Sequence, residues 1–290
     1  MKVPVKVDGR QLTLSNLDKV LYPEVGFTKA EVIDYYSRIA PVLLPHLRDR
    51  PLTVKRYPNG VDGAFFFEKN APQHTPSWLR RATLPVPGST KNRETIDFAI
   101  IDDLPSLAYY ANLAALELHV PQWKVGKDGT ALPPDLLVLD LDPGPPATVV
   151  DCCRVAALIR DVLAEDGLAA WPKTSGNKGM QLYAPWDNRV EPSGYARELA
   201  QRLEKEHPRQ VVSVMAKKLR PGKVFIDWSQ NNPAKTTIAP YSLRANSRPT
   251  VSTPLLWEEV EDCENPEELV FTAPDVLARV EDHGDLFGQA

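Results

Sequence analysis

The run Leu136–Asp142, with the sequence Leu-Leu-Val-Leu-Asp-Leu-Asp, constrains the fold more than any other segment of this chain. Side chains alternate between the two faces of a strand, so Asp140 and Asp142 project from one face and the alternating leucines from the other. The proline-rich sequence Pro143–Pro146 follows directly and predicts the end of the strand, because proline cannot donate to the ladder. The run therefore predicts a strand with one face in a core and two carboxylates at its exposed carboxyl end.

Two carboxylates a few ångströms apart repel each other, and a shared cation is one explanation for the pair. The alternative is a solvated strand end that carries two surface acids. A third acid favours the first interpretation, because Asp227 lies in the apolar sequence Lys223–Trp228, where a carboxylate is costly unless it is paired or bound to a metal. On neighbouring strands, Asp140, Asp142 and Asp227 would form an all-oxygen site for Mg²⁺ or Mn²⁺, and two such ions would serve nucleotidyl transfer.

Helix and strand patterns alternate along the rest of the chain. Thr28 and Glu31 form the signature of a capping box before a segment whose apolar positions recur at helical spacing. One helix is expected to begin at residue 28, and three others are expected over 105–118, 148–166 and 195–206. Strands are expected at the start of 12–22 and over 52–57, 64–68, 136–142, 168–174, 180–184, 211–215 and 223–228. This mixture predicts an α/β or α+β architecture.

Composition excludes several classes of protein. The 290 residues include 34 Lys+Arg and 38 Asp+Glu, so net charge gives no global attraction to nucleic acid and a polyanion must be held by a local basic patch. No stretch approaches about 18 consecutive apolar residues, and no membrane partner is expected. Three cysteines, of which Cys152 and Cys153 are adjacent packing residues, make no disulfide framework, so we expect a reducing cytoplasm.

The segment Lys173–Gly179, Lys-Thr-Ser-Gly-Asn-Lys-Gly, is a turn rich in phosphate-binding groups. It offers backbone N–H groups, hydroxyls and positive charge, but it lacks the spacing of a Walker A loop, and a plain hairpin turn explains the same residues. Further polar residues bracket Asp227 and suit a triphosphate–metal complex, although each alone would also fit a solvated face. They are Lys217, Lys218, Arg220, Lys223, Gln230, Lys235 and Arg244.

Cations and aromatic residues also gather in the N-terminal part of the chain. Lys55 ends a predicted strand, and Phe65–Phe67 follow it. Aromatic rings beside cations can stack on a base while the cations hold the nucleic-acid backbone. The alternative is a core position, since an alternating strand would bury at least one of the three rings. His119 is either a satisfied core histidine or a nucleotide contact.

Eight segments in order resemble the motif series of the bacterial primase-polymerases: LSNLDKVLYP, KRYPNG, FFFEK, ELHVPQW, LDLDPG, KTSGNKG, KVFIDWSQN and KTTIAPYSLR. This family contains the polymerase domain of bacterial DNA ligase D and its stand-alone actinobacterial relatives, within the archaeo-eukaryotic primase superfamily. The resemblance extends from about residue 10 to about residue 287. It implies a primase-type catalytic core with an RRM-like palm and a second sheet, flanked by helices.

The resemblance also implies roles for individual residues. Asp140, Asp142 and Asp227 would be the catalytic acids that bind two Mn²⁺ or Mg²⁺ ions. The nucleotide-binding residues would be Lys55, Phe66, Phe67, His119, Ser175, Lys178, Arg220, Gln230 and Arg244, with the two phenylalanines stacked on the incoming or templating base. The pocket for the 5′-phosphate of the DNA would consist of Asn16, Lys19 and Lys29.

The implied activity is template-directed addition of nucleotides, preferably ribonucleotides, to a 3′-hydroxyl at short gaps or breaks in 5′-phosphorylated DNA. We expect one catalytic domain over residues 1–290, with DNA-binding elements in about 1–130 and the palm in about 131–250, in a cytoplasmic protein associated with the nucleoid. No ligase or nuclease motif is present, which favours a stand-alone gap-filling enzyme. The alternatives are an end-joining module that works with Ku and a DNA ligase, a metal-dependent phosphohydrolase or nuclease, and a non-catalytic module that binds 5′-phosphorylated DNA ends.

One position departs from the pattern of the family. Many relatives carry His after the glycine turn, where this chain has Gln181. Glutamine can hydrogen-bond but cannot become cationic. The departure bears on the role of this position and on nucleotide affinity.

Overall fold

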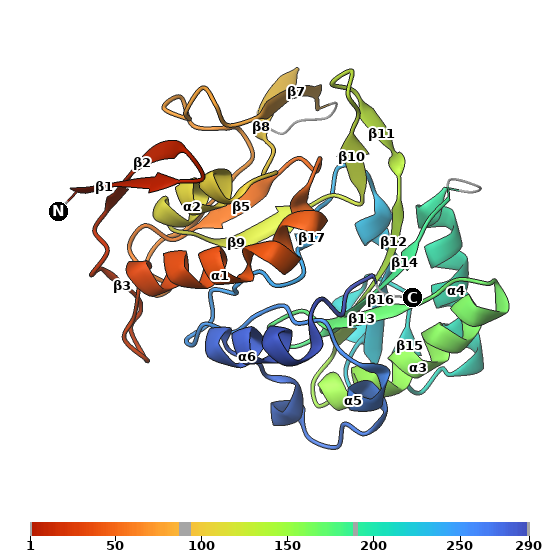
Figure 1. Ribbon diagram of the computed structural model, residues 1–290. Helices are drawn as coiled ribbons and strands as arrows, with labels where there is room; N and C mark the ends of the chain where they lie inside the picture. The colour runs from red at the N-terminus through yellow and green to blue at the C-terminus, as the bar shows by residue number, and fades with distance from the viewer. Residues whose placement is uncertain (1, 87–93, 188–190, 289–290) are drawn as a thin grey trace. The chain divides into compact units, whose positions relative to one another are not determined.

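The computed structural model describes residues 2–86, 94–187 and 191–288 (Figure 1). The chain divides into two units. Unit 1 contains Met1–Leu132, Thr236–Thr250 and Thr272–Gly284, and unit 2 contains Pro133–Lys235, Val251–Phe271 and Asp285–Ala290. Within the described residues, none of the helices has the length and hydropathy that a membrane span requires.

Unit 2 is built on a mixed sheet with the strand order β13-β14-β12-β16-β15. Its elements are β12 (Leu136–Pro143), α3 (Val149–Glu165), β13 (Trp171–Thr174), β14 (Met180–Pro185), α4 (Pro192–Glu206), β15 (Val211–Val212), η1 (Lys217–Leu219), β16 (Val224–Asp227), η2 (Trp228–Asn231), α5 (Trp257–Glu261) and η3 (Pro266–Leu269). The series β12-α3-β13-β14-α4-β16 is a βαββαβ unit with antiparallel neighbours, and only β15 runs parallel to its neighbour β16. This arrangement confirms the expected RRM-like palm.

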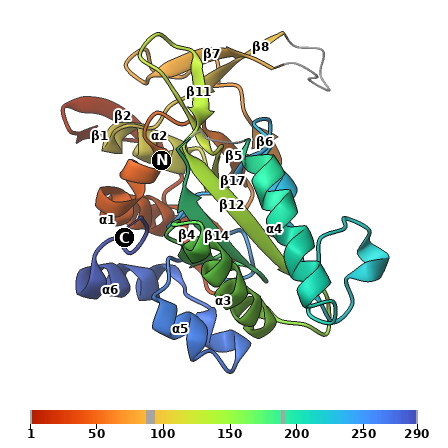
Figure 2. The ribbon, with the colours of Figure 1, turned by 90° about the vertical axis from the view of Figure 1, so that its right-hand side faces the viewer.

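The core of unit 2 lies on one face of this sheet. Leu137, Leu139 and Leu141 of β12 are at most 1% exposed and pack with residues of α3 and α4. Figure 2 shows both helices over the same side of β12 and β14. Because the leucines alternate with the acids, burial of one face leaves the acids on the other face, as the sequence predicts.

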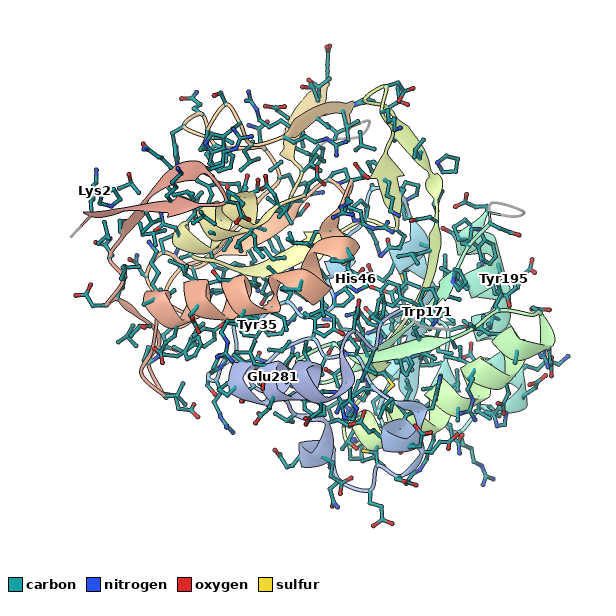
Figure 3. The ribbon with its side chains drawn as sticks, viewed as in Figure 1. Lys2, Tyr35, His46, Trp171, Tyr195 and Glu281 are labelled. Atoms are coloured by element: carbon teal, nitrogen blue, oxygen red, sulfur yellow. The ribbon has the colours of Figure 1, made fainter. Side chains whose placement is uncertain are left out.

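Helix α3 begins close to where the sequence predicts and starts with a capping box. Thr148 accepts a hydrogen bond from the backbone N–H of Val150, and Asp151 accepts one from the backbone N–H of Thr148. Cys152 and Cys153 are buried in the core on this helix, which confirms their reading as packing residues. On the other face of the sheet, Trp171 (Figure 3) packs edge-on against Phe287.

Unit 1 contains a second sheet with the order β17-β9-β5-β6. The elements of unit 1 are β1 (Lys2–Val7), β2 (Arg10–Ser15), β3 (Val20–Tyr22), β4 (Phe27–Thr28), α1 (Lys29–Leu47), β5 (Thr53–Arg56), β6 (Phe66–Glu68), β7 (Arg81–Pro85), β8 (Thr95–Ala99), α2 (Leu104–Asn112), β9 (Ala115–Val120), β10 (Trp123–Val125), β17 (Thr237–Ile238) and α6 (Ala273–His283). Strand β11 (Ala131–Pro134) follows β10. The α/β (α+β) class with a second sheet is therefore confirmed.

Helix α1 anchors two segments that carry predicted site residues. The capping box of Thr28 and Glu31 is formed as predicted. The buried hydroxyl of Tyr35 (Figure 3) donates to the carbonyl of Tyr241 at 2.8 Å, and that of Tyr36 donates to the carbonyl of Leu116 at 2.6 Å. These bonds hold the chain around residues 241–244 and β9 against the same helix.

For unit 1, one expected element and one alternative interpretation are wrong. The helix expected over 105–118 ends at Asn112, Ala114 has a positive φ of 57°, and Ala115–Val120 form a strand. Pairing of β9 with β5 and β17 overrides the helical propensity of its alanine and leucines. The three rings of Phe65–Phe67 are 44–60% exposed, so none is buried, because β6 is a short strand at the edge of its sheet.

Candidate active site

The three predicted catalytic acids converge on one face of the palm sheet in unit 2. Strands β12 and β16 are antiparallel neighbours, and Asp140 lies directly opposite Asp227 in their register. Asp142 lies two residues further along β12, opposite Phe225. Residues that pair across a sheet share a face, so the pairing brings together acids that lie far apart in the sequence.

Hydrogen bonds orient two of the three carboxylates. Asp140 Oδ1 accepts from Gln181 Nε2 at 3.0 Å. Asp227 accepts from the backbone N–H of Ser229 at 3.1 Å and from Gln230 Nε2 at 2.9 Å. Gln230, predicted to bind nucleotide, thus contacts a predicted metal-binding acid in this structure.

Burial and mutual repulsion make these acids difficult to ionise together. Burial, and then the charge of Asp142, raise the pKa of Asp140 to about 7, although the hydrogen bond from Gln181 opposes the shift. Burial, and then the charge of Asp227, also raise the pKa of Asp142. A cation among the carboxylates would offset both effects.

The chemistry of this group suits a hard divalent ion, because all its donors are oxygens and the side chain of Asp142 is 53% exposed. Among the described residues, however, no three His, Cys, Asp or Glu side chains are arranged as a preformed metal site. The carboxylates instead accept hydrogen bonds from their neighbours. Coordination would therefore require rotation of side chains that the strand register already places together.

Two glycines allow close approach of the backbone near the carboxyl end of β12. A Cβ at Gly179 would lie 2.1 Å from the carbonyl oxygen of Leu141, and one at Gly144 would lie 2.1 Å from that of Arg220. Any other residue would push the glycine turn or the 217–223 segment away from β12. The glycines of the turn and of Pro143–Pro146 thus have a packing role beside the acids.

The predicted phosphate-binding residues of unit 2 flank the acids. Ser175 Oγ accepts from the backbone N–H of Gly179 at 3.2 Å and closes the turn, while Lys178 is exposed. The Arg220 guanidinium lies 3.7 Å from the ring centroid of Phe225, with Nη1 4.0 Å from Asp142 Oδ2. Its Nε is buried without a hydrogen-bond partner among the described residues, which leaves a donor for an anionic ligand.

A second group of predicted residues meets in unit 1 around an acid that the sequence reasoning missed. Glu117 is 3% exposed, and its carboxylate lies 3.0 Å from His119 Nε2, 3.6 Å from Arg244 Nη1 and 3.8 Å from Lys55 Nζ. Burial alone would raise the pKa of Glu117, but the hydrogen bond with His119 and the charges of Arg244, His119 and Lys55 lower it to about 2. Glu117 therefore stays ionised and holds the three basic side chains together.

This basic group retains capacity for a ligand. Arg244 Nε is buried with no hydrogen-bond partner in the described part of the chain. Burial lowers the pKa of His119, although Glu117 opposes the shift. His119 is hydrogen-bonded to Glu117, and its ring centroid lies 6.3 Å from that of Phe67, so its surroundings fit both a satisfied buried histidine and a nucleotide contact.

Exposed aromatic rings border the same basic group. Lys55 Nζ lies 4.1 Å from the ring centroid of Phe65 and 5.7 Å from that of Phe67. Arg56 lies over Phe66 at 5.1 Å. These cation–π contacts hold open-faced rings beside positive charge, an arrangement that suits base stacking.

The residues predicted to bind a 5′-phosphate also lie near one another in unit 1. Asn16 adopts a positive φ of 53° in the turn before β3, and its carbonyl accepts from the backbone N–H of Lys19. Lys19 Nζ donates to Asn59 Oδ1 at 3.0 Å, and Lys29 Nζ donates to the carbonyl of Ser15 at 2.6 Å. Burial, followed by the charges of Lys19 and Arg56, lowers the pKa of Lys29 to about 8. A phosphate dianion would relieve this crowding of positive charge.

The palm with its carboxylates defines a nucleotidyltransferase of the polymerase class, and comparison with known proteins places the chain in that class. A family model, LigD primase-polymerase domain, matches residues 28–287, and the chain belongs to this family. The resemblance seen in the motif series is thereby confirmed.

Named relatives and a solved structure agree with this assignment. The chain is 46% identical over 279 residues to the multifunctional non-homologous end joining protein LigD of Mycolicibacterium smegmatis, covering 95% of this chain and 35% of that protein. It is 31% identical over 278 residues to the bifunctional protein LigD of Bacillus subtilis, covering 94% and 43%. The polymerase domain of Mycobacterium tuberculosis ligase D in complex with DNA matches with a TM-score of 0.88 and 45% identity, over 95% of this chain and 96% of that one, which confirms the primase-type fold. The chain thus spans about a third of the length of its mycobacterial relative.

Proposed function

We propose that this chain is a DNA-repair polymerase that adds nucleotides to a 3′-hydroxyl at short gaps or breaks, by a mechanism with two divalent ions. The observation that carries the proposal is the pairing of Asp140 with Asp227, two residues from Asp142, on the open face of an RRM-like palm. Clustered carboxylates of which two, Asp140 and Asp142, have raised pKa values have little structural benefit, whereas they suit Mn²⁺ or Mg²⁺.

The residues of the chain would divide the reaction among them. Asp140, Asp142 and Asp227 would hold the ions, which activate the 3′-hydroxyl and stabilise charge on the leaving pyrophosphate when they are bound. In unit 2, Ser175, Lys178, Arg220 and Gln230 would contact the incoming nucleotide. In unit 1, Lys55, His119 and Arg244 would contribute positive charge and hydrogen bonds to nucleotide, with Phe66 and Phe67 stacking on a base.

Recognition of the DNA would depend on Lys19, Lys29 and Asn16, which would bind the 5′-phosphate on the downstream side of a gap. The crowding that lowers the pKa of Lys29 supports an anionic ligand there. A 5′-phosphate is common to gaps and to broken ends. We propose gap filling as the activity, with ribonucleotides as preferred substrates.

A second candidate is end joining in cooperation with Ku and a DNA ligase. It is favoured by the names of the relatives, which are non-homologous end joining proteins. The two candidates differ in the substrate: gap filling predicts best extension on a continuous template with a short gap, and end joining predicts extension across two ends held by short complementary overhangs, increased by added Ku.

Primer extension tests the proposal. The substrate is a labelled duplex with a short gap and a 5′-phosphate, supplied with Mn²⁺ and either ribonucleotides or deoxyribonucleotides, and the wild type is compared with Asp140→Ala/Asp142→Ala. We expect template-directed extension by the wild type alone, faster with ribonucleotides. Equal extension by both proteins would refute the mechanism, and release of nucleotides from the labelled strand without added substrate would indicate a nuclease. Binding without extension, dependent on Lys19 and Lys29, would indicate a non-catalytic end-binding module.

A further inference from the structure

A continuous row of polar side chains crosses four strands of the palm sheet. In the strand registers, Lys173 of β13 lies opposite Gln181 of β14, Gln181 opposite Asp140 of β12, and Asp140 opposite Asp227 of β16. Direct partners share a face of the sheet, so all four side chains lie on the face that carries the acids. Lys173, predicted only as the first residue of the phosphate-binding turn, and Gln181 thus join the acids on one face of the sheet.

Lys173 lies at the buried end of this row. Its side chain is 0% exposed, and Nζ donates to Gln181 Oε1 at 2.7 Å and to Ser252 Oγ at 2.6 Å. The Ser252 hydroxyl in turn donates to the carbonyl of Thr174 at 2.8 Å, which leaves its lone pairs for Lys173. Although Lys173 begins the glycine-turn motif, a fully buried ammonium group cannot reach a nucleotide, unlike the exposed Lys178 at the other end of that motif.

Chemistry permits only one orientation of the Gln181 amide. A lysine ammonium group can only donate hydrogen bonds, and an ionised carboxylate can only accept them. The amide oxygen therefore faces Lys173 and the amide nitrogen faces Asp140 Oδ1, at 3.0 Å. A flipped amide would place two donors together and two acceptors together. The row is thus a directed series of donors from Lys173 through Gln181 to Asp140.

We propose that Gln181 and Lys173 are positioning residues that hold the Asp140 carboxylate in one orientation for a divalent cation, with Ser252 fixing Lys173. The inference rests on the proposed function, in which Asp140 binds the ion. Groups behind a metal ligand commonly change metal affinity by about 10–100-fold when they are removed. Neither Lys173 nor Gln181 touches the substrate in this scheme.

The same geometry explains why a residue at position 181 need not be cationic. The position requires one acceptor toward Lys173 and one donor toward Asp140, and a neutral imidazole supplies one of each, as an amide does. Gln181→His should preserve the row. Gln181→Met fills a similar volume without either polar group and should break it.

Mn²⁺ binding to the protein alone, measured by electron paramagnetic resonance of the free ion, tests the proposal without depending on polymerase activity. We expect Gln181→Met and Lys173→Met each to weaken Mn²⁺ binding at least about 10-fold, and Gln181→His to stay within about 3-fold of wild type. Because the two residues act in series, the double variant should bind no more weakly than Gln181→Met. Lys205→Met, at an exposed lysine of α4 with no role in the proposed site, is the matched control and should leave Mn²⁺ binding unchanged.

Melting curves identify variants that fail to fold, and Ser252→Ala, which removes only one partner of Lys173, provides a milder perturbation with the same predicted direction. A folded Gln181→Met that binds Mn²⁺ as tightly as wild type would overturn the proposal, and so would a folded Gln181→His that binds as weakly as Gln181→Met. Absence of Mn²⁺ binding by the wild type would overturn it as well. If the wild type binds Mn²⁺ but does not extend primers, the proposed polymerase function fails while the comparison of variants still decides the role of the row.

Discussion

Neutralising Asp140 should stabilise the protein while it abolishes nucleotide addition. The perturbation is Asp140→Asn, which keeps the shape of the side chain and an acceptor for Gln181 Nε2. The new amide nitrogen would face Asp142 and Asp227, so the substitution replaces repulsion by hydrogen bonding. The variant therefore isolates the cost of holding a carboxylate at this position.

The magnitude follows from the pKa of Asp140, which burial and then Asp142 raise from 3.8 to about 7. That difference corresponds to at most about 4 kcal/mol of destabilisation in the ionised protein, since a shift of one pKa unit is about 1.4 kcal/mol. Relaxation around the carboxylate reduces this value, so we expect a gain of about 1–4 kcal/mol. At about 2 °C per kcal/mol for a chain of this size, the Tm should rise by about 2–8 °C.

The pH dependence has a definite sign. Below pH 3.8 Asp140 is protonated in both the folded and the unfolded chain, so its ionisation has no effect on stability. Between pH 3.8 and about 7 the unfolded chain ionises first, and the destabilisation grows until it is complete above about pH 7. The advantage of Asp140→Asn should therefore be largest at pH 8 and disappear as the pH falls toward 4.

Thermal melts without divalent ions measure the effect, with Asp142→Asn as the control. Asp142 is 53% exposed at its side chain, and neutralising it should stabilise the protein less. Added Mn²⁺ should raise the Tm of the wild type more than that of Asp140→Asn. A Tm for Asp140→Asn at or below that of the wild type at pH 8 would refute the reasoning.

Three further predictions concern other parts of the chain. Glu117→Gln should destabilise unit 1 by about 3 kcal/mol or more, because it leaves clustered cations uncompensated, and urea denaturation measures this loss. The same substitution should raise the KM for nucleotide, which steady-state primer extension measures. Preference for 5′-phosphorylated over 5′-hydroxyl DNA should decline as the pH rises from 7 to 9, since Lys29 loses its proton near pH 8, and Lys29→Arg should remove this dependence in a binding titration. Thr148→Ala should lower the free energy of unfolding by about 1 kcal/mol through loss of the N-cap of α3, and a urea denaturation curve measures this change. Nucleotide addition should be unchanged, and a primer-extension assay checks this.

The parts of the fold that the sequence predicts well are those in which local pattern and tertiary packing agree. The strand 136–143 and the helix of residues 149–165 have an alternating or helical apolar pattern, clear end signals and a buried apolar face, so their positions follow closely from the sequence. The segment 105–118 is different. Its alanines and leucines favour a helix, but its second half pairs with two strands, one of them from residues 237–238, and no local signal carries that information.

The candidate site also combines residues that the sequence pattern identifies with residues that it does not. The shared face of Asp140 and Asp142 follows from strand periodicity, and the unusual position of Asp227 follows from its apolar neighbours. Glu117 could have been found by that second criterion, because it too is an acid within an apolar strand, Ala115–Val120. The role of Lys173 could not, since its burial depends on Ser252, which lies 79 residues further along the chain.

The register that assembles the site is determined by the residues that alternate with it. Next to the polar row runs a buried row of one threonine and three apolar residues, each at most 3% exposed. In it, Thr174 pairs with Met180, Met180 with Leu141, and Leu141 with Ile226. A slip of one residue in any strand would turn a member of the polar row into the core and an apolar residue out of it. Burying one ionised side chain among apolar residues without a partner costs several kcal/mol, in addition to the apolar burial that the slip would lose. Hydrophobic burial on one face of the palm therefore holds mutually repelling carboxylates together on the other, and this explains how an arrangement of acids that destabilises the protein persists in its fold.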